Sequence, residues 1–170
     1  MQYIIAQIIG GIGLICSLLS FQCKNRKKIM TFQMLGSLSF CVQLFVLGAI
    51  TGGYLDLICF VRTIIFSKKG EKKWADSIIW LIAFSVILVV TGIITWENAY
   101  SILPIIGSVL STIALWMKSA KNIRKISLLV GPCWFIYNII NGAITGAINE
   151  LLAMTSIIIG MIRHDVKKKE

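Results

Sequence analysis

A polar and aromatic cluster inside an otherwise apolar segment is the best candidate for chemistry in this sequence. Trp134, Asn138 and Asn141 recur at helical spacing, with Tyr137 beside them, so one helix face would carry an indole and two amides. Such a face could stack against a ring and hydrogen-bond to hydroxyl groups, which suits a neutral polar or ring-containing solute. The same residues could instead tie neighbouring helices together. Further candidates for solute contact are Gln43 and Asn149.

Three charged residues lie within apolar segments. Asp56 and Glu150 are expected about one turn into their helices, where a carboxylate complements the helix dipole by about 0.3 to 1 kcal/mol. The alternative is a gating or proton-coupling pair across a central axis. Arg62 lies shortly before the end of its segment, so its long stem could reach the cytoplasmic headgroups. A buried partner or a role as an inner gate is the alternative for this residue.

The string Gly-Ala-Ile-Thr-Gly occurs twice, at Gly48 to Gly52 and at Gly142 to Gly146. The two strings, and the acids Asp56 and Glu150 that follow them, are both offset by 94 positions (142 − 48 and 150 − 56). A fixed offset of this kind indicates an internal duplication. Since glycine permits a tight reversal, all four glycines of the two strings are expected to form hinges between helices.

Composition places the chain in a lipid bilayer. The 170 residues are 57% hydrophobic and only 14% charged, whereas about a quarter of residues are charged in a typical soluble domain, and the mean hydropathy is +0.85. Seven segments are long enough to be membrane-spanning helices: 3–21, 29–49, 52–66, 77–96, 102–117, 126–141 and 146–162. Five spans would result if each Gly-Ala-Ile-Thr-Gly string lay inside one long, kinked helix.

The distribution of basic residues favours seven spans. Sixteen of the seventeen Lys and Arg residues fall in four clusters that seven helices would put on one side, which is then the cytoplasmic side. The N-terminus is therefore expected outside and the C-terminus in the cytoplasm. Because the net charge of +10 is not gathered on one face, binding to nucleic acid is not expected. The clusters are Lys24, Arg26, Lys27 and Lys28; Lys68, Lys69, Lys72 and Lys73; Lys118, Lys121, Arg124 and Lys125; and Arg163, Lys167, Lys168 and Lys169.

These patterns predict an all-α polytopic membrane protein built from two parallel three-helix repeats. Residues 1–69 would form the first repeat, residues 70–101 a linker helix region, and residues 102–170 the second repeat with a basic cytoplasmic tail. In transporters with internal repeats, the solute site lies where the halves meet. The expected partners are the lipid bilayer and an unknown small solute, and a homo-oligomer is a further option.

No motif indicates an enzyme, a metal or a cofactor. The sequence has no Gly-x-Ser-x-Gly, no phosphate-binding glycine loop and no His-x-x-x-His. Its five cysteines lack the Cys-x-x-Cys spacing of a metal or redox pair. The expectation is a protein without catalytic activity.

Three stretches carry a resemblance to a known family. The run from Pro132 to Asn138, the stretch from Leu103 to Gly107, and Ile58 to Thr63 together resemble the YgjV family of bacterial inner-membrane proteins. The resemblance implies a multi-pass protein of the bacterial cytoplasmic membrane.

The three-one-three arrangement is also similar in architecture to the SWEET, PQ-loop and PnuC-type transporters. The Pro-Gln dipeptide of the PQ-loop group is absent, because Ala6 precedes Gln7 and Ile105 follows Pro104. Transport of a small solute by alternating access is the function that this similarity implies. A membrane scaffold, immunity factor or assembly partner is the alternative, and a central cavity near Asn138 would distinguish the two.

Overall fold

The computed structural model describes residues 1–22, 26–117 and 119–162. For residues 20–22, 26–30, 33 and 120 it describes the backbone alone. Lys24, Lys118 and the basic tail from Arg163 onward, which the sequence analysis assigned to basic clusters, lie outside the described residues.

The described chain is helical and has no strand, so the prediction of an all-α fold is confirmed. Five helices contain windows long and apolar enough to cross a bilayer, and two shorter apolar helical segments, Met34–Val46 and Ile79–Ile94, accompany them. Two short 3-10 helices, η1 (Lys73–Asp76) and η2 (Ala99–Ser101), lie on either side of α4. The seven described α-helices are α1 (Gln2–Gln22), α2 (Arg26–Val46), α3 (Ile50–Ser67), α4 (Ile79–Ile94), α5 (Ile102–Trp116), α6 (Ala120–Ile140) and α7 (Ile144–Met161).

The largest difference from the predicted boundaries is at the start of α6. The helix begins at Ala120 and not at residue 126, so Lys121, Arg124 and Lys125 form part of its first two turns. Lys and Arg are good helix formers, and their long stems can lie along apolar surface while the charged ends reach water. The basic segment therefore continues the helix and does not form the loop that the sequence analysis expected.

The two Gly-Ala-Ile-Thr-Gly copies form turns of almost identical geometry. Gly48 and Gly142 have positive φ angles of 79° and 71°, a region that side-chain-bearing residues rarely adopt. The following alanines, Ala49 and Ala143, have φ of −80° in both copies, with ψ of 70° and 68°. Each alanine N–H donates to the carbonyl five residues earlier, at 2.9 and 2.8 Å.

The second glycine of each string is not a hinge, contrary to the sequence expectation. Gly52 and Gly146 are the third residues of α3 and α7. Both positions suit a residue without a side chain. A Cβ at Gly52 would lie 2.4 Å from Cε1 of Tyr137, and one at Gly146 would lie 3.0 Å from Nδ2 of Asn138. These glycines allow α6 to approach both helices closely.

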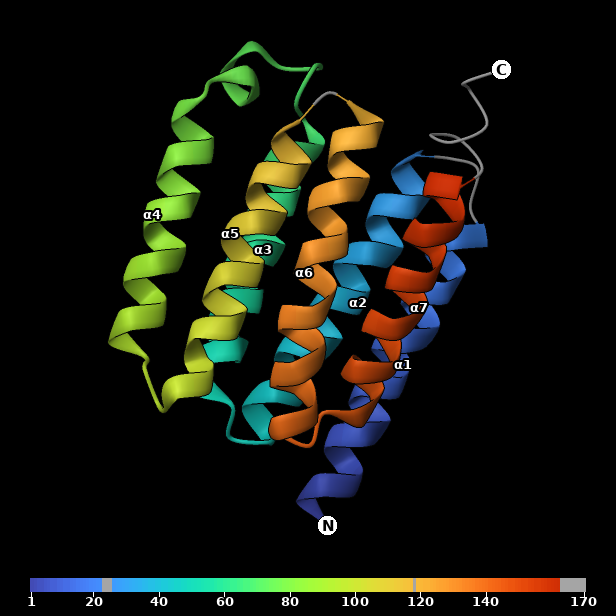
Figure 1. The fold of residues 1–170 in the computed structure, drawn as a ribbon, viewed down its shortest axis with the longest axis vertical. Coiled ribbons are helices and arrows are strands. Elements are labelled where there is room, and N and C mark those ends of the chain that lie inside the picture. The colour runs from blue at the N-terminus through green and yellow to red at the C-terminus, as the bar shows by residue number, and fades with distance from the viewer. Residues whose placement is uncertain (23–25, 118, 163–170) are drawn as a thin grey trace.

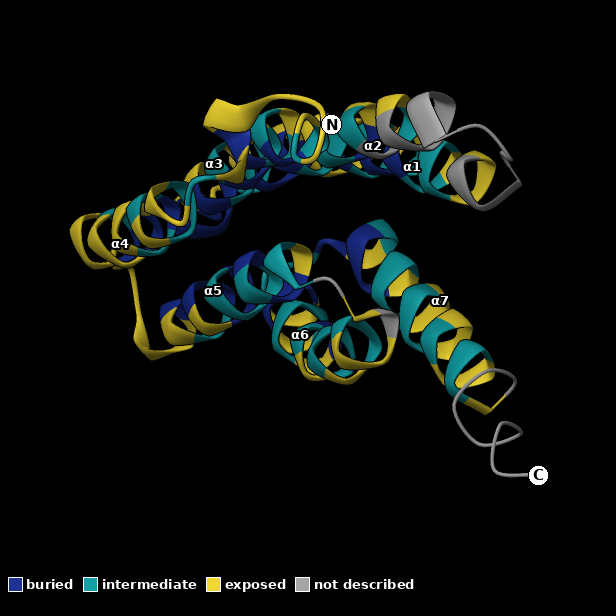
Figure 2. Cartoon of the chain, turned by 90° about the horizontal axis from the view of Figure 1, so that it is seen from above, coloured by how far each residue is buried: buried dark blue, intermediate teal, exposed yellow. Residues whose placement is uncertain are grey.

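The helices form two layers, which Figure 2 shows from above. The first layer holds α4, α3, α2 and α1 in that order, and the second holds α5, α6 and α7. Contacts between the layers join α3 and α4 to α5, and α1 to α7. In Figure 1 the N-terminus lies at the opposite end of the helices from the last described turn of α7.

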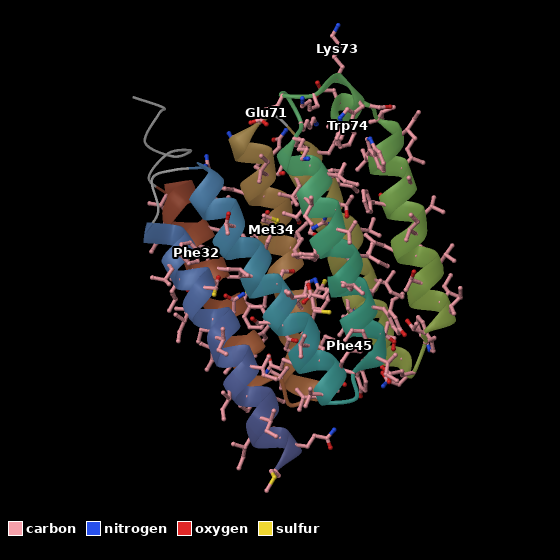
Figure 3. All side chains as sticks on the ribbon, turned by 180° about the vertical axis from the view of Figure 1, so that it is seen from behind. Phe32, Met34, Phe45, Glu71, Lys73 and Trp74 are labelled. Atoms are coloured by element: carbon pink, nitrogen blue, oxygen red, sulfur yellow. The ribbon has the colours of Figure 1, made fainter. Side chains whose placement is uncertain are left out.

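The two ends of the bundle differ in charge. The connection between α3 and α4, with Lys68, Lys69, Lys72 and Lys73, lies at the same end as the starts of α2 and α6, and we call this the basic end. Figure 3 shows Lys73, Glu71 and Trp74 there and Phe45 toward the opposite end. The opposite end holds the turns at Gly48 and Gly142 and the connection between α4 and α5.

Apolar side chains cover much of the outer surface. On α4, Ile79, Ile82, Val86, Val90 and Ile93 are all exposed at helical spacing, and α1 exposes isoleucines in the same way. Such stripes are unfavourable in water over this length, but they match the hydrocarbon of a bilayer. The chain is therefore embedded in lipid.

Candidate functional site

A cavity of about 240 Å³ lies between five helices, α1, α2, α3, α6 and α7. Gly36 and Val130 line it from the middle of α2 and α6. Since these helices are long enough to cross a membrane, the cavity lies well inside the bundle. A cavity lined by apolar side chains and a few polar groups is the usual form of a solute site.

Most of the described lining residues form pairs that are related by the repeat offset. Four pairs are offset by 94 positions, and both members of each pair face the same cavity. The pairs are Gly36 and Val130, Phe40 and Trp134, Leu44 and Asn138, and Asp56 and Glu150. Of the paired residues, Gly36, Val130, Phe40 and Leu44 were not predicted to line a site. Applying the same offset to the polar cluster on α6 would have found the last two.

The two carboxyl groups lie deeper than the sequence analysis expected. Asp56 and Glu150 are the seventh residues of α3 and α7, and neither helix has an acid in its first turn. Complementing the helix dipole is therefore not their role, because that effect fades beyond the first turn. Both line the cavity, and they are close enough to interact electrostatically. Ser37 Oγ on α2 donates a hydrogen bond to Asp56 Oδ1 at 3.3 Å.

Asn138 is buried and faces the cavity. It is only 6% exposed, and its side chain makes no hydrogen bond to another group in the described part of the chain. Its backbone carbonyl accepts from Ala143 N at 2.8 Å, which fixes the end of α6. An amide that lines a cavity without a protein partner is suited to bind a ligand or water.

Trp134 lies one turn before Asn138 and also lines the cavity. The pyrrole edge of its indole lies over Gly107 of α5, where a Cβ would be 2.9 Å from Cδ1. Tyr137 packs edge-on against it, with ring centroids 6.1 Å apart. The indole is therefore held on two sides. Asn149 of α7 is the other predicted residue in the lining.

Three of the predicted solute contacts lie outside the cavity. Tyr137 is 1% exposed, and its hydroxyl accepts from Gly52 N at 3.0 Å. Asn141 caps its own helix, because its Nδ2 donates to Tyr137 O at 2.9 Å. Gln43 is fully buried among polar groups of α1 and α7. These residues tie helices or turns together, which was the alternative that the sequence analysis left open.

Gln43 belongs to a polar network at the opposite end. Its Nε2 donates to Thr145 Oγ1 at 2.7 Å and to Gln7 Oε1 at 3.2 Å. Gln7 Nε2 in turn donates to Gly142 O at 2.7 Å. The network joins α1, α2 and the start of α7, so it connects the two layers on the opposite-end side of the cavity.

Arg62 does not extend to the headgroups, although the sequence analysis favoured that position. It is 4% exposed, and one guanidinium nitrogen donates to Ser108 O at 3.3 Å, Ser111 Oγ at 2.9 Å and Thr112 Oγ1 at 2.5 Å. All three acceptors lie on α5. Buried hydrogen bonds to a charged donor replace the water that a snorkelling side chain would find.

The fold and the cavity define a class of protein, a polytopic helical membrane protein with a polar cavity between its helices. The chain belongs to the Imp-YgjV family of bacterial inner membrane proteins, whose family model matches residues 4–168. It is similar to inner membrane protein YgjV of Escherichia coli strain K12, with 24% identity over 149 residues, which cover 87% of this chain and 78% of that protein.

No solved structure matches the chain. The resemblance to the YgjV family is confirmed, and so is the location in the bacterial inner membrane as a multi-pass protein. Contact with the lipid bilayer follows from that location.

Proposed function

We propose that the protein transports a small polar solute across the bacterial inner membrane by alternating access. The observation that carries the proposal is the cavity between α1, α2, α3, α6 and α7, with Asp56, Glu150, Asn138 and Trp134 in its lining. A scaffold that only packs helices has no use for an amide that faces a cavity without a protein partner. The proposal assigns no catalytic step to any residue.

The proposed transport unit is a pair of three-helix repeats, α1–α3 and α5–α7, with α4 as the linker. Equivalent positions of the repeats line one cavity. The contacts between the repeats are also reciprocal: Gln43 of the first reaches Thr145 of the second, while Tyr137, at the position equivalent to Gln43, reaches Gly52 beside the equivalent threonine. Reciprocal contacts support a twofold axis along the membrane normal.

The proposed orientation puts the basic end in the cytoplasm. The described Lys and Arg residues, apart from Arg62, lie at that end, and short cytoplasmic loops are enriched in these residues. The N-terminus would then be outside.

In the proposed cycle, this structure is the state closed toward the outside. The Gln7–Gln43–Thr145 network crosses between the layers on that side, whereas α7 diverges from α1 and α2 toward the basic end in Figure 2. Opening outward would break the network and pivot the helices at the Gly48 and Gly142 turns. Arg62, which joins α3 to α5, would hold a second, inner contact between the repeats.

The test is solute flux in proteoliposomes. Purified protein would be screened by counterflow against sugars, amino acids, nucleosides, vitamins and small amines. For any solute that moves, Asn138→Ala should lower the flux about tenfold, because a buried hydrogen bond contributes roughly 1 to 3 kcal/mol. Asn141→Ala is the matched control, since this amide lies near the same end of α6 but outside the cavity.

Flux at background for the whole panel would contradict transport and favour the scaffold or assembly role. Equal flux in wild type and Asn138→Ala would leave transport intact but move the site elsewhere.

A further inference from the structure

We propose that the solute of this cavity is a small organic ammonium ion, held between Asp56 and Glu150 with Asn138 and Trp134 completing its surroundings. The inference rests on the proposed function for its transport aspect, but binding can be measured without transport. It replaces the neutral solute that the polar cluster on α6 suggested.

The first argument is charge balance. Among the described residues, the cavity lining contains two acids, Asp56 and Glu150, and no Lys, Arg or His. Arg62 is close enough to interact electrostatically with Asp56, yet the hydrogen bonds of its guanidinium go to α5. Two carboxyl groups at membrane depth keep their negative charge only where positive charge lies nearby. A bound cation would supply it.

The second argument is the unused amide of Asn138. The residue is 6% exposed, it lines the cavity, and its side chain has no hydrogen-bond partner in the described part of the chain. An amide oxygen accepts hydrogen bonds, and an ammonium group can only donate them. A positively charged hydrogen-bond donor would therefore bind both the Asn138 amide oxygen and the two carboxylates.

The third argument separates an organic cation from a bare metal ion. Hard metal ions prefer a complete shell of oxygen ligands, whereas Phe40, Leu44 and Val130 give this cavity a carbon-rich wall. Trp134 adds an indole, the ring to which organic cations bind best. At about 240 Å³, the cavity is below the range of about 300 to 1,000 Å³ that holds drug-sized ligands. The best fit is an ammonium group with a short carbon substituent.

Isothermal titration calorimetry of the protein in nanodiscs tests the proposal. The probes are protonated 2-aminoethanol against ethylene glycol, and n-butylammonium against 1-butanol, in potassium phosphate buffer. Each pair has nearly the same shape and differs in charge. At least one ammonium ion should bind about tenfold more tightly than its partner. Replacing potassium by sodium should change neither affinity.

Asp56→Asn and Glu150→Gln keep the shape of each side chain and remove its charge. Each should weaken binding of the ammonium ion about tenfold or more, while the empty protein still folds, because neither substitution changes the volume of the side chain. Glu71→Gln is the control, since Glu71 is exposed in the loop at the basic end. It should leave binding unchanged.

The outcomes separate this proposal from transport itself. Binding of the ammonium ion without flux would support the site and overturn the transport function. Flux of a neutral solute that survives both acid substitutions would support transport and overturn the ammonium ion. The proposal is also wrong if the neutral isosteres bind as well as the ions, if only sodium or potassium binds, or if no probe binds.

Discussion

The two halves of this bundle share a backbone but not a set of side chains. The turns at Gly48 and Gly142 differ by only 8° in φ (79 − 71). At the equivalent cavity positions, however, α2 presents Phe40 and Leu44 where α6 presents Trp134 and Asn138. Backbone geometry has been kept by the duplication, while the side chains that a solute would meet have diverged.

The first turns of α3 and α7 show the same contrast. The N–H groups at a helix start have no partner within the helix. In α3, Thr51 N donates to Glu97 and Gly52 N to Tyr137. In α7, Thr145 N donates to Gln7 of α1. Backbone donors at equivalent positions therefore bind unrelated acceptors. The contacts at the start of α3 can break without those at the start of α7.

Asn138→Leu should have the largest effect, because it gives α6 the residue of its α2 counterpart, Leu44. Flux of the transported solute is expected to fall to background, since the buried amide is lost and leucine fills a similar volume. Stability should not fall, because an unpartnered polar group is removed. Flux and unfolding in detergent would be measured together. A variant that unfolds early would show that Asn138 is structural.

Gly52→Ala and Gly146→Ala place the same methyl group at equivalent positions. At Gly52 the added Cβ would lie 2.4 Å from the Tyr137 ring, whereas at Gly146 it would lie 3.0 Å from the Asn138 amide. Overpacking against a buried ring costs about 1 to 3 kcal/mol. At Gly146 the movable amide and the helix preference for alanine, about 1 kcal/mol, should nearly cancel the cost. Equal unfolding free energies in the two variants would contradict the described packing.

Tyr137→Phe should have the smallest effect. It removes the acceptor of the Gly52 N–H and is expected to lower the free energy of unfolding by about 1 kcal/mol. Solute affinity should be unchanged, because Tyr137 does not line the cavity. The measurement is chemical unfolding beside equilibrium binding. A change in affinity with no change in stability would place the hydroxyl at the solute.

Much of the fold followed from local patterns. Seven apolar segments and the paired turns could be predicted because hydropathy and glycine act over short stretches. The start of α6 could not, since basic residues are compatible with both a helix and a loop. Gly52 and Gly146 were assigned to hinges because composition does not distinguish a turn glycine from one that permits close packing.

The site was predicted less completely. Trp134, Asn138, Asn149 and the two acids do share a cavity. Gln43, Tyr137 and Asn141 do not, because helical spacing shows which residues share a face but not which neighbouring helix covers it. The burial of Arg62 depends on oxygen acceptors of α5, and a contact between distant segments leaves no trace in the pattern around Arg62 itself.

The position of Arg62 also bears on how the chain assembles. Its acceptors follow 46 to 50 residues later in the sequence, so α3 leaves the ribosome before α5 exists. An arginine at the centre of a lone span opposes insertion by about 2.5 to 3.5 kcal/mol, and Arg62, five residues before the end of α3, would meet part of that cost. We therefore expect α3 to insert stably only after α5 has been made and can accept hydrogen bonds from the guanidinium. Stable insertion of the first half of the protein would thus depend on synthesis of the second half.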